Sequence, residues 1–303
     1  MARLDNIQSG RNTYLCYQDI EYMRSSTENI YQQKVNQVID YISSNLYKPL
    51  KLDTLANQIN VSQRQLLRIM RLSLNESLYS YLARQRVERA VLYMQTEEMN
   101  LTKLAEMVGY DNPQALSKAF KKQFGIPPKA YMDELQGRLV GYVKSSGSRQ
   151  NHLQSEIYEE EDLELVYIRI IGKYGEDEPY ETAWNKLIRF LKDKQALSKE
   201  TRFIGISFDD PNITKSEYCR FYACASIKKK IVPTGEFGTI QLRRGKYAIY
   251  TLKGSYSGLQ ELYNHISVNF DYNIRHGMTF EEYISCSEEN SKEPITKVYI
   301  PIK

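Results

Sequence analysis

Residues 101–131 read LTKLAEMVGYDNPQALSKAFKKQFGIPPKAY, and this stretch decides the fold of the first half of the chain. Apolar residues at helical spacing end at a glycine, a short turn follows, and a second amphipathic segment begins after Asn112, a residue type that caps helices. Leu116, Ala119 and Phe120 form the apolar face of this second segment. Two short helices joined by a tight turn, with a cationic outer face on the second, predict a helix-turn-helix.

A similar pattern occurs earlier in the chain, over residues 52–62, where Leu, Leu-Ala and Ile or Val recur at matching positions. An amphipathic segment follows it as well, with Ser62 as its expected N-cap and Leu66 and Ile69 on its apolar face. Residues 77–95 between the two units are interpreted as one continuous helix, about 28 Å long at 1.5 Å per residue. Successive major-groove faces on one side of B-DNA lie about 34 Å apart, so this helix could hold two recognition helices near the required spacing.

The outer faces of both second helices carry side chains that suit DNA. Cationic and amide groups opposite an apolar face can reach base edges and phosphates. The expected DNA-binding residues are Arg64, Gln65, Arg68 and Arg71 in the first unit and Gln114, Ser117, Lys118 and Lys121 in the second. Arg68 is the best candidate for a bidentate guanine contact, and Gln65 or Gln114 for adenine. Residues 1–150 carry a net charge of +6 and the remainder −2, which supports this assignment.

Length and composition restrict the class of protein. A chain of 303 residues suggests about two domains. With 42% apolar residues, 26% charged residues and a mean hydropathy of −0.55, the composition excludes disorder throughout and a membrane protein. The N-terminus lacks the apolar segment of a secretory signal, so we expect a cytoplasmic protein. The four cysteines and three histidines are scattered without metal-ligand spacing, and no metal or other cofactor is expected.

The second half of the chain has a different pattern. Residues 137–161 are polar and are interpreted as a linker, and residues 1–29 as an N-terminal extension. Strand-like and helix-like runs then alternate: strand 163–171, helix 179–191, strands 201–208 and 219–227, strands 239–242 and 247–252, helix 256–268 and strand 296–302. The expected fold is an all-α double helix-turn-helix domain over residues 30–136, followed by an α+β domain over residues 162–303. In that domain a strand-helix-strand-strand unit is used twice, about a pseudo-twofold axis with a cleft between the halves.

Aromatic residues gather around one carboxylate in the second half. The expected ligand-binding residues are Glu281, Trp184, Tyr256, Tyr283 and Tyr174. A buried glutamate between Tyr and Trp faces attracts a desolvated organic cation through its charge and through cation–π contacts. The alternative interpretation is that Glu281 and Glu282 are solvated charges at a helix end and that Trp184 only fills the core.

Residues 52–132 resemble the DNA-binding domain of the AraC/XylS transcription regulators. The similarity is carried by LAEMVGY at 104–110, AFKKQFGIPPKAY at 119–131 and YLARQR at 81–86. Pro113 lies where most members have Ser or Phe near the turn, and Leu67 where several relatives have a polar, base-reading residue. The resemblance therefore implies DNA binding, with a target sequence that differs from theirs.

Residues 163–303 resemble a GyrI-like effector domain. The motifs are GKYG at 172–175, GISFDDP at 205–211, EYCRFYA at 217–223, GKYA at 245–248, GSY at 254–256, EEY at 281–283 and VYIPI at 298–302. This resemblance implies a sensor of small, aromatic or cationic compounds with Glu281 at the ligand cleft. Some members of the family instead hydrolyse strained cyclopropane-bearing compounds, using the cleft glutamate to activate water.

The leading hypothesis is a cytoplasmic, sequence-specific transcription regulator. Its partners would be double-stranded DNA, a small aromatic or cationic ligand and RNA polymerase, with no role at a membrane. The alternative is a hydrolase of cyclopropane-bearing xenobiotics that uses Glu281 as its catalytic residue and is fused to a DNA-binding domain. A third interpretation makes the second domain a protein-interaction module that inhibits a partner enzyme.

Overall fold

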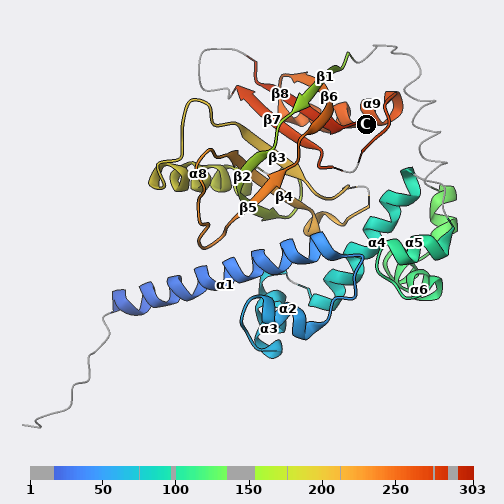
Figure 1. Cartoon of the computed structure of the whole chain (residues 1–303), viewed down its shortest axis with the longest axis horizontal. Coiled ribbons are helices and arrows are strands. Elements are labelled where there is room, and N and C mark those ends of the chain that lie inside the picture. The colour runs from blue at the N-terminus through green and yellow to red at the C-terminus, as the bar shows by residue number, and fades with distance from the viewer. Residues whose placement is uncertain are drawn as a thin grey trace, which may run out of the picture.

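The computed structural model describes residues 17–74, 76–96, 100–134, 154–175, 177–211, 213–275, 277–285 and 293–303. A helical half precedes a half built on an eight-stranded antiparallel sheet with helices, which confirms the expected fold class (Figure 1). Residues 1–16 of the expected N-terminal extension and residues 137–153 of the expected linker lie outside the described residues. No helix among the described residues is both long enough and apolar enough to cross a membrane.

The helical half contains two helix-turn-helix units joined by one long helix. Its elements are α1 (Tyr17–Asn45), α2 (Leu52–Gln58), α3 (Gln63–Leu74), α4 (Leu78–Thr96), α5 (Leu101–Met107) and α6 (Pro113–Phe124). Helices α2 and α3 form the first unit, α5 and α6 form the second, and α4 connects them, as the sequence predicted. Figure 1 shows the two units flanking α4, both away from the sheet. Helix α1 begins at Tyr17, within the segment expected to be an extension.

Local signals in the sequence set the ends of these helices. The Asn112 side chain accepts a hydrogen bond from the backbone N–H of Ala115 at 2.8 Å, and Ser62 Oγ accepts one from Gln65 at 3.2 Å. Both residues are therefore caps, as expected. Pro113 is the first residue of α6, a position where its missing N–H leaves no hydrogen bond unmade.

Each helix-turn-helix unit has its own apolar core. In the first unit, Val38, Ile39 and Ile42 of α1 pack with Leu66, Ile69 and Met70 of α3. In the second, Val87 and Val91 of α4 pack with Leu104, Val108, Leu116 and Phe120. Because each apolar stripe predicted from helical spacing is buried, the opposite faces of α3 and α6 are free to meet solvent or DNA.

The second half is built on a sheet with the strand order β1-β6-β8-β7-β3-β4-β2-β5. Its strands are β1 (Glu156–Glu160), β2 (Leu163–Ile171), β3 (Phe203–Ser207), β4 (Arg220–Ser226), β5 (Phe237–Leu242), β6 (Gly245–Lys253), β7 (Phe280–Ser285) and β8 (Ile295–Pro301). Counted outward from the central β7–β3 pair, the strands follow the order β7-β8-β6 on one side and β3-β4-β2 on the other. The expected duplication is therefore present, and its two halves meet where Gly205 lies opposite Glu281.

Two helices cover one face of this sheet. Helix α8 (Asp177–Asp193) packs on β2 and β4 through an apolar cluster that includes Leu187 and Leu191. Helix α9 (Leu259–Asn269) contributes Leu262 and Ile266 to a cluster with residues of β6 and β8. The central β3–β7 pair therefore lies between the areas that the two helices cover. This boundary is where the candidate ligand site lies.

Two strands were not expected from the sequence. Residues 156–160, assigned to the linker, form β1 and pair with β6, with Tyr158 opposite Tyr247. Only Glu160 in β1 is buried, so this edge strand is largely exposed and lacks the usual alternation of buried and exposed side chains. Residues 280–285, where one interpretation placed a helix end, form β7 between β3 and β8. Glu281 and Glu282 are 4% and 7% exposed, so they are not solvated.

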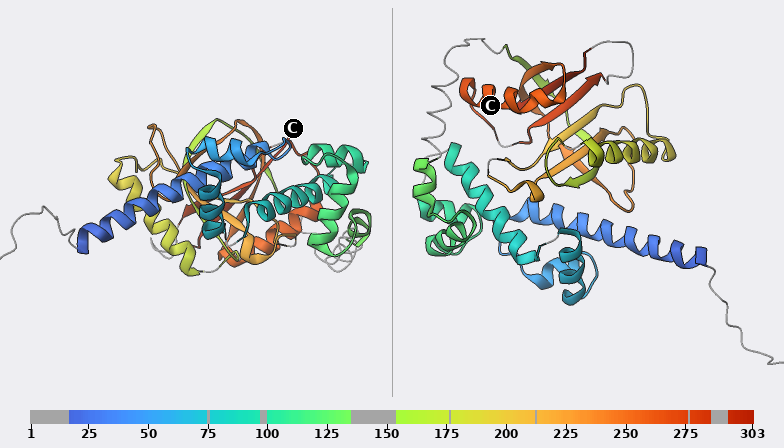
Figure 2. Two further views of the ribbon diagram at one scale, coloured as in Figure 1. Left: turned by 90° about the horizontal axis from the view of Figure 1, so that it is seen from below. Right: turned by 180° about the vertical axis from the view of Figure 1, so that it is seen from behind.

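Helix α1 belongs to both halves of the molecule. Its apolar side fills the core of the first helix-turn-helix unit, while its polar side faces the sheet. Asp40 accepts a hydrogen bond from Arg169 Nη2 at 2.9 Å and one from the Tyr167 hydroxyl at 2.6 Å. Asn36 accepts from Arg169 Nη1 at 2.6 Å and donates to the carbonyl of Glu236 at 2.9 Å. Figures 1 and 2 show α1 running along the sheet, between it and α2 and α3.

Candidate DNA-binding surface and ligand site

The expected DNA-binding residues lie on the outer faces of α3 and α6. Six of the eight are exposed and two, Gln65 and Ser117, are partly buried. The exposed residues are Arg64, Arg68, Arg71, Gln114, Lys118 and Lys121. Among the described residues, none of the three arginines and two lysines in this set forms an ion pair or a hydrogen bond with another side chain. Their charges are thus unneutralised at the surface, as a phosphate-binding face requires.

Gln65 is held differently from its neighbours. Its side-chain Nε2 donates a hydrogen bond to the Tyr31 hydroxyl of α1 at 2.9 Å. In this conformation the amide faces α1, so Gln114 is the better placed of the two glutamines to reach adenine. Arg64 and Arg68 on the same helix have no such restraint.

Arg86 of α4 connects the two helix-turn-helix units. Its guanidinium donates to the carbonyls of Leu46 at 3.1 Å and Lys48 at 2.9 Å, which follow the end of α1. It also lies beside Gly109 of the second unit, where the backbone φ is 84° and a Cβ would lie 2.3 Å from the Leu46 carbonyl oxygen. A glycine is therefore required at this close approach.

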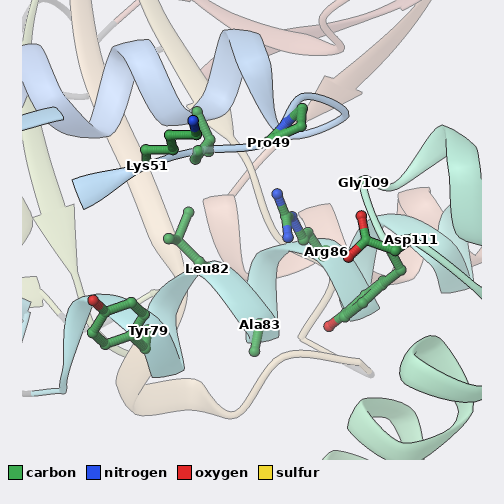
Figure 3. A pocket seen from close by; sticks show the side chains of 10 residues that line it. Pro49, Lys51, Tyr79, Leu82, Ala83, Arg86, Gly109 and Asp111 are labelled. Atoms are coloured by element: carbon green, nitrogen blue, oxygen red, sulfur yellow. The ribbon is translucent and has the colours of Figure 1, made fainter. Parts of the chain in front are cut away.

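A groove lies between the units at this point, with a cavity of about 320 Å³ (Figure 3). It is lined by Pro49, Leu50, Lys51, Tyr79, Leu82, Ala83, Arg86, Gly109, Tyr110 and Asp111. The sequence had not singled out this groove. Its walls come from segments far apart in the chain, which residue spacing alone does not bring together.

Glu281 of β7 is the centre of the candidate ligand site. It is 4% exposed, and its two carboxylate oxygens accept hydrogen bonds from the hydroxyls of Tyr263 at 3.0 Å and Tyr283 at 2.7 Å. Burial raises the pKa of Glu281, and the two tyrosine hydrogen bonds lower it in part. Among the described residues no cation pairs with this carboxylate. The site therefore holds a buried acid with two donors and no counter-charge.

Aromatic rings extend from this carboxylate to the surface. The Tyr283 ring meets Trp184 of α8 edge to face at 5.6 Å between centroids, and Tyr256 at 5.4 Å. Tyr256 is 44% exposed, so it lies at the outer end of the series. Four of the five expected ligand-site residues, Glu281, Tyr283, Trp184 and Tyr256, are thus brought together. The alternative interpretation of Trp184 as filler is partly right, since it also packs in the apolar cluster under α8.

Two tyrosines differ from what the sequence suggested. Tyr263 of α9 bonds Glu281 directly but was not among the expected residues; its place in an amphipathic helix gave only a general signal. The Tyr174 hydroxyl is occupied by backbone groups, with Asp209 N–H at 3.1 Å and the carbonyls of Arg220 and Asp209 at 2.9 and 3.0 Å. It is therefore not free to bind a ligand through its oxygen.

Glu282 lies on the opposite face from Glu281, because side chains alternate along a strand. Its carboxylate accepts hydrogen bonds from Arg202 Nε and from the Tyr299 hydroxyl, both at 2.6 Å. Burial alone would raise the pKa of Glu282, but Arg202 and Tyr299 lower it below its usual value. Within the part of the chain that the structure describes, Glu282 has a cationic partner and Glu281 does not.

The two halves match two known domain families. Residues 55–134 match a helix-turn-helix domain, and residues 153–303 match a GyrI-like small molecule binding domain. The chain therefore carries an AraC-type helix-turn-helix domain followed by a C-terminal GyrI-like domain. Within the described residues, no group of three or more His, Cys, Asp or Glu side chains could hold a metal ion.

Individual relatives match the DNA-binding half. The HTH-type transcriptional regulator GbdR of Pseudomonas aeruginosa is 34% identical over 110 residues, covering 36% of this chain and 29% of GbdR. The multiple antibiotic resistance protein MarA of Escherichia coli is 27% identical over 104 residues, covering 34% of this chain and 82% of MarA. The solved C-terminal domain of AraT, a response regulator from Geobacillus stearothermophilus, is 31% identical, with a TM-score of 0.33; the match covers 33% of this chain and 84% of that domain. The chain thus spans about three tenths of the length of GbdR.

Proposed function

We propose that this chain is a cytoplasmic, sequence-specific transcription regulator. In this proposal α3 and α6 bind neighbouring major grooves of double-stranded DNA, and Glu281 binds a small aromatic cation. The observation that carries it is that one chain joins two exposed cationic helices to a buried carboxylate that pairs with no cation among the described residues. We further propose that the DNA-bound chain contacts RNA polymerase.

The DNA-binding part of the proposal rests on the geometry of α4. This helix has 19 residues, a length of about 28 Å at 1.5 Å per residue, and each recognition helix is anchored near it by a separate core. The spacing is close to the roughly 34 Å between successive major-groove faces. Unpaired cations on both outer faces supply the phosphate and base contacts.

Arg68→Ala and Lys118→Ala are expected to weaken binding to a duplex selected by this chain from a random library. A bidentate base contact contributes about 1–3 kcal/mol, so Arg68→Ala should weaken affinity by about fivefold to 150-fold. The measurement is a titration at about 150 mM salt, since affinity depends on ionic strength. Arg189→Ala, which removes an exposed arginine of α8, is the matched control and should leave affinity unchanged. Selection of no preferred sequence would count against the proposal.

The ligand part of the proposal rests on the charge of Glu281. Glu281→Gln keeps the shape of the side chain but removes its charge, so binding of the probe tetraphenylphosphonium should weaken by at least about tenfold, which corresponds to roughly 1.4 kcal/mol. Isothermal titration calorimetry of the full chain measures this. Glu261→Gln, on the exposed surface of α9, is the control. Equal affinities in wild type and Glu281→Gln would contradict the assignment.

The pH dependence has a defined sign. Because burial raises the pKa of Glu281, the carboxylate takes up a proton at a higher pH than an ordinary glutamate as pH falls. Since the cation binds only the ionised form, its affinity should decrease as pH falls, beginning above the usual range for glutamate.

A further inference from the structure

A loop of the sheet domain docks on α4. We define the docking loop as residues 208–211 and 213–219 of the segment that connects β3 to β4. Ile213 in this loop is 8% exposed and packs in the core of the second helix-turn-helix unit, with Val87 and Val91 of α4. At its other end the Tyr218 ring lies 4.7 Å from the guanidinium of Arg84, also on α4. The loop therefore contacts the helix that connects the two DNA-binding units.

A buried ion pair closes the docking loop and extends to α4. Asp209, at the start of the loop, accepts hydrogen bonds from Arg220 Nη2 at 2.7 Å, from its Nε at 2.9 Å and from its backbone N–H at 2.7 Å. The remaining nitrogen, Arg220 Nη1, donates to the Tyr81 hydroxyl of α4 at 3.2 Å. Tyr81 is fully buried. The two ends of the loop are thus tied to each other and to α4.

Tyr174 joins this loop to the apolar cluster beside the ligand site. Its hydroxyl accepts from the backbone N–H of Asp209 and lies within hydrogen-bonding distance of the carbonyl of Arg220, so it connects the two ends of the loop. Its ring packs in the same apolar cluster as Trp184 and Tyr283. Tyr174 is also one of the groups that raise the pKa of Tyr263, after burial and Glu281. One residue therefore packs its ring against the apolar cluster that Trp184 and Tyr283 also contact, and has its oxygen at the docking loop.

We infer that Tyr174 is the positioning residue that couples occupancy of the Glu281 site to the orientation of α4. The inference rests on the proposed function, since it names how that ligand site is regulated. A ligand bound beside Trp184 and Tyr283 shifts the apolar cluster that the Tyr174 ring packs against, and the Tyr174 hydroxyl then moves Asp209 and Arg220. The Tyr81 hydrogen bond and the Ile213 contact transmit this shift to α4, whose orientation sets the two recognition helices.

Such coupling has a measurable definition. If a ligand changes the affinity for DNA, the ratio of the dissociation constants with and without ligand gives the coupling factor, typically about 5–150-fold. A ligand changes DNA binding only if it distinguishes two states of the protein. The docking loop is the element through which those states would differ.

Tyr174→Phe in the full chain tests the inference, because it keeps the ring and removes only the hydroxyl. In wild type, saturating tetraphenylphosphonium should change the affinity for the selected duplex by at least about fivefold. In Tyr174→Phe this factor should fall to near one, while the affinity for tetraphenylphosphonium itself stays within about threefold of wild type. Tyr158→Phe, at a 53% exposed position of β1, is the matched control and should retain the full factor. An unchanged factor in Tyr174→Phe would overturn the inference.

Hydrogen exchange provides a second readout that needs no ligand. Tyr174→Phe should speed exchange of backbone amides in the docking loop and in α4, and Tyr158→Phe should not. Unchanged exchange in α4 overturns the inference, whatever the ligand result. Failure of tetraphenylphosphonium to bind wild type would instead overturn the proposed ligand site, and the exchange measurement would still decide whether Tyr174 acts on α4.

Discussion

Arg220→Ala is expected to lower the free energy of unfolding by about 3–5 kcal/mol, because it leaves the Asp209 charge buried without its cation. The two side chains are 7% and 3% exposed, and their closest N–O distance is 2.7 Å. Urea denaturation followed by tryptophan fluorescence measures this loss. Trp184 is the single tryptophan of the chain and lies in the sheet domain that contains the pair.

Two further variants separate the effect of burial from the loss of an arginine. Arg243 is 75% exposed and lies 3.9 Å from Asp162, so Arg243→Ala should cost less than about 1 kcal/mol. The double variant Asp209→Ala/Arg220→Ala removes both charges and should lose less stability than the two single losses combined. If Arg220→Ala lowers the free energy of unfolding no more than Arg243→Ala does, the buried pair does not contribute the expected stability.

Phe120→Ala is expected to destabilise the second helix-turn-helix unit by about 3–5 kcal/mol, because it opens a cavity in a small core. Phe120 is fully buried, and its ring lies 4.8 Å from Phe124 and 5.4 Å from Tyr131 between centroids. Far-UV circular dichroism during urea denaturation should show the helical signal lost at lower urea. Affinity for the selected duplex should fall as α6 loses its anchor.

The exposed Leu72 supplies the control for this prediction. It lies on α3 with 79% of its surface exposed, so Leu72→Ala should leave the unfolding curve unchanged. In Phe120→Ala the transition reported by Trp184 should move less than the circular dichroism transition, since Trp184 lies in the other domain. If the circular dichroism and Trp184 fluorescence transitions of Phe120→Ala coincide and both occur at the urea concentration of wild type, the assignment of Phe120 to the core is contradicted.

The helical half was predictable because its signals are local. Helix spacing identified the buried faces of α3 and α6, and the caps Ser62 and Asn112 mark where those helices begin. The sheet half was less predictable at β1 and β7. β1 is an edge strand with four of its five residues exposed. β7 contains two buried glutamates, a residue type that is expected to face solvent. Their burial depends on Arg202, Tyr299 and Tyr263, which are distant in the chain.

The ligand site could be predicted in part for the same reason. Residue type and motif identified Glu281 and Tyr283, which are two residues apart on one face of a strand. Tyr263 reaches the carboxylate from α9, a helix that packs on β6 and β8, and β8 is the neighbour of β7. The hydroxyl of Tyr174 is turned to Asp209 and Arg220 by the path of the loop between β3 and β4. These relations depend on the register of the β3–β7 pair, which spacing along the chain does not specify.

The double role of α1 limits how such proteins can be recombined. Its apolar side completes the first DNA-binding unit, while Asn36 and Asp40 bind Arg169 in the sheet domain. Cutting the chain between its two sequence families would leave Arg169, whose side chain is 5% exposed in the intact molecule, without these partners. A new sensor module can therefore be grafted onto this DNA-binding half only if it brings a surface that fits the polar side of α1. Lineages that exchange sensors should accordingly inherit the sheet and this helix as one evolutionary unit.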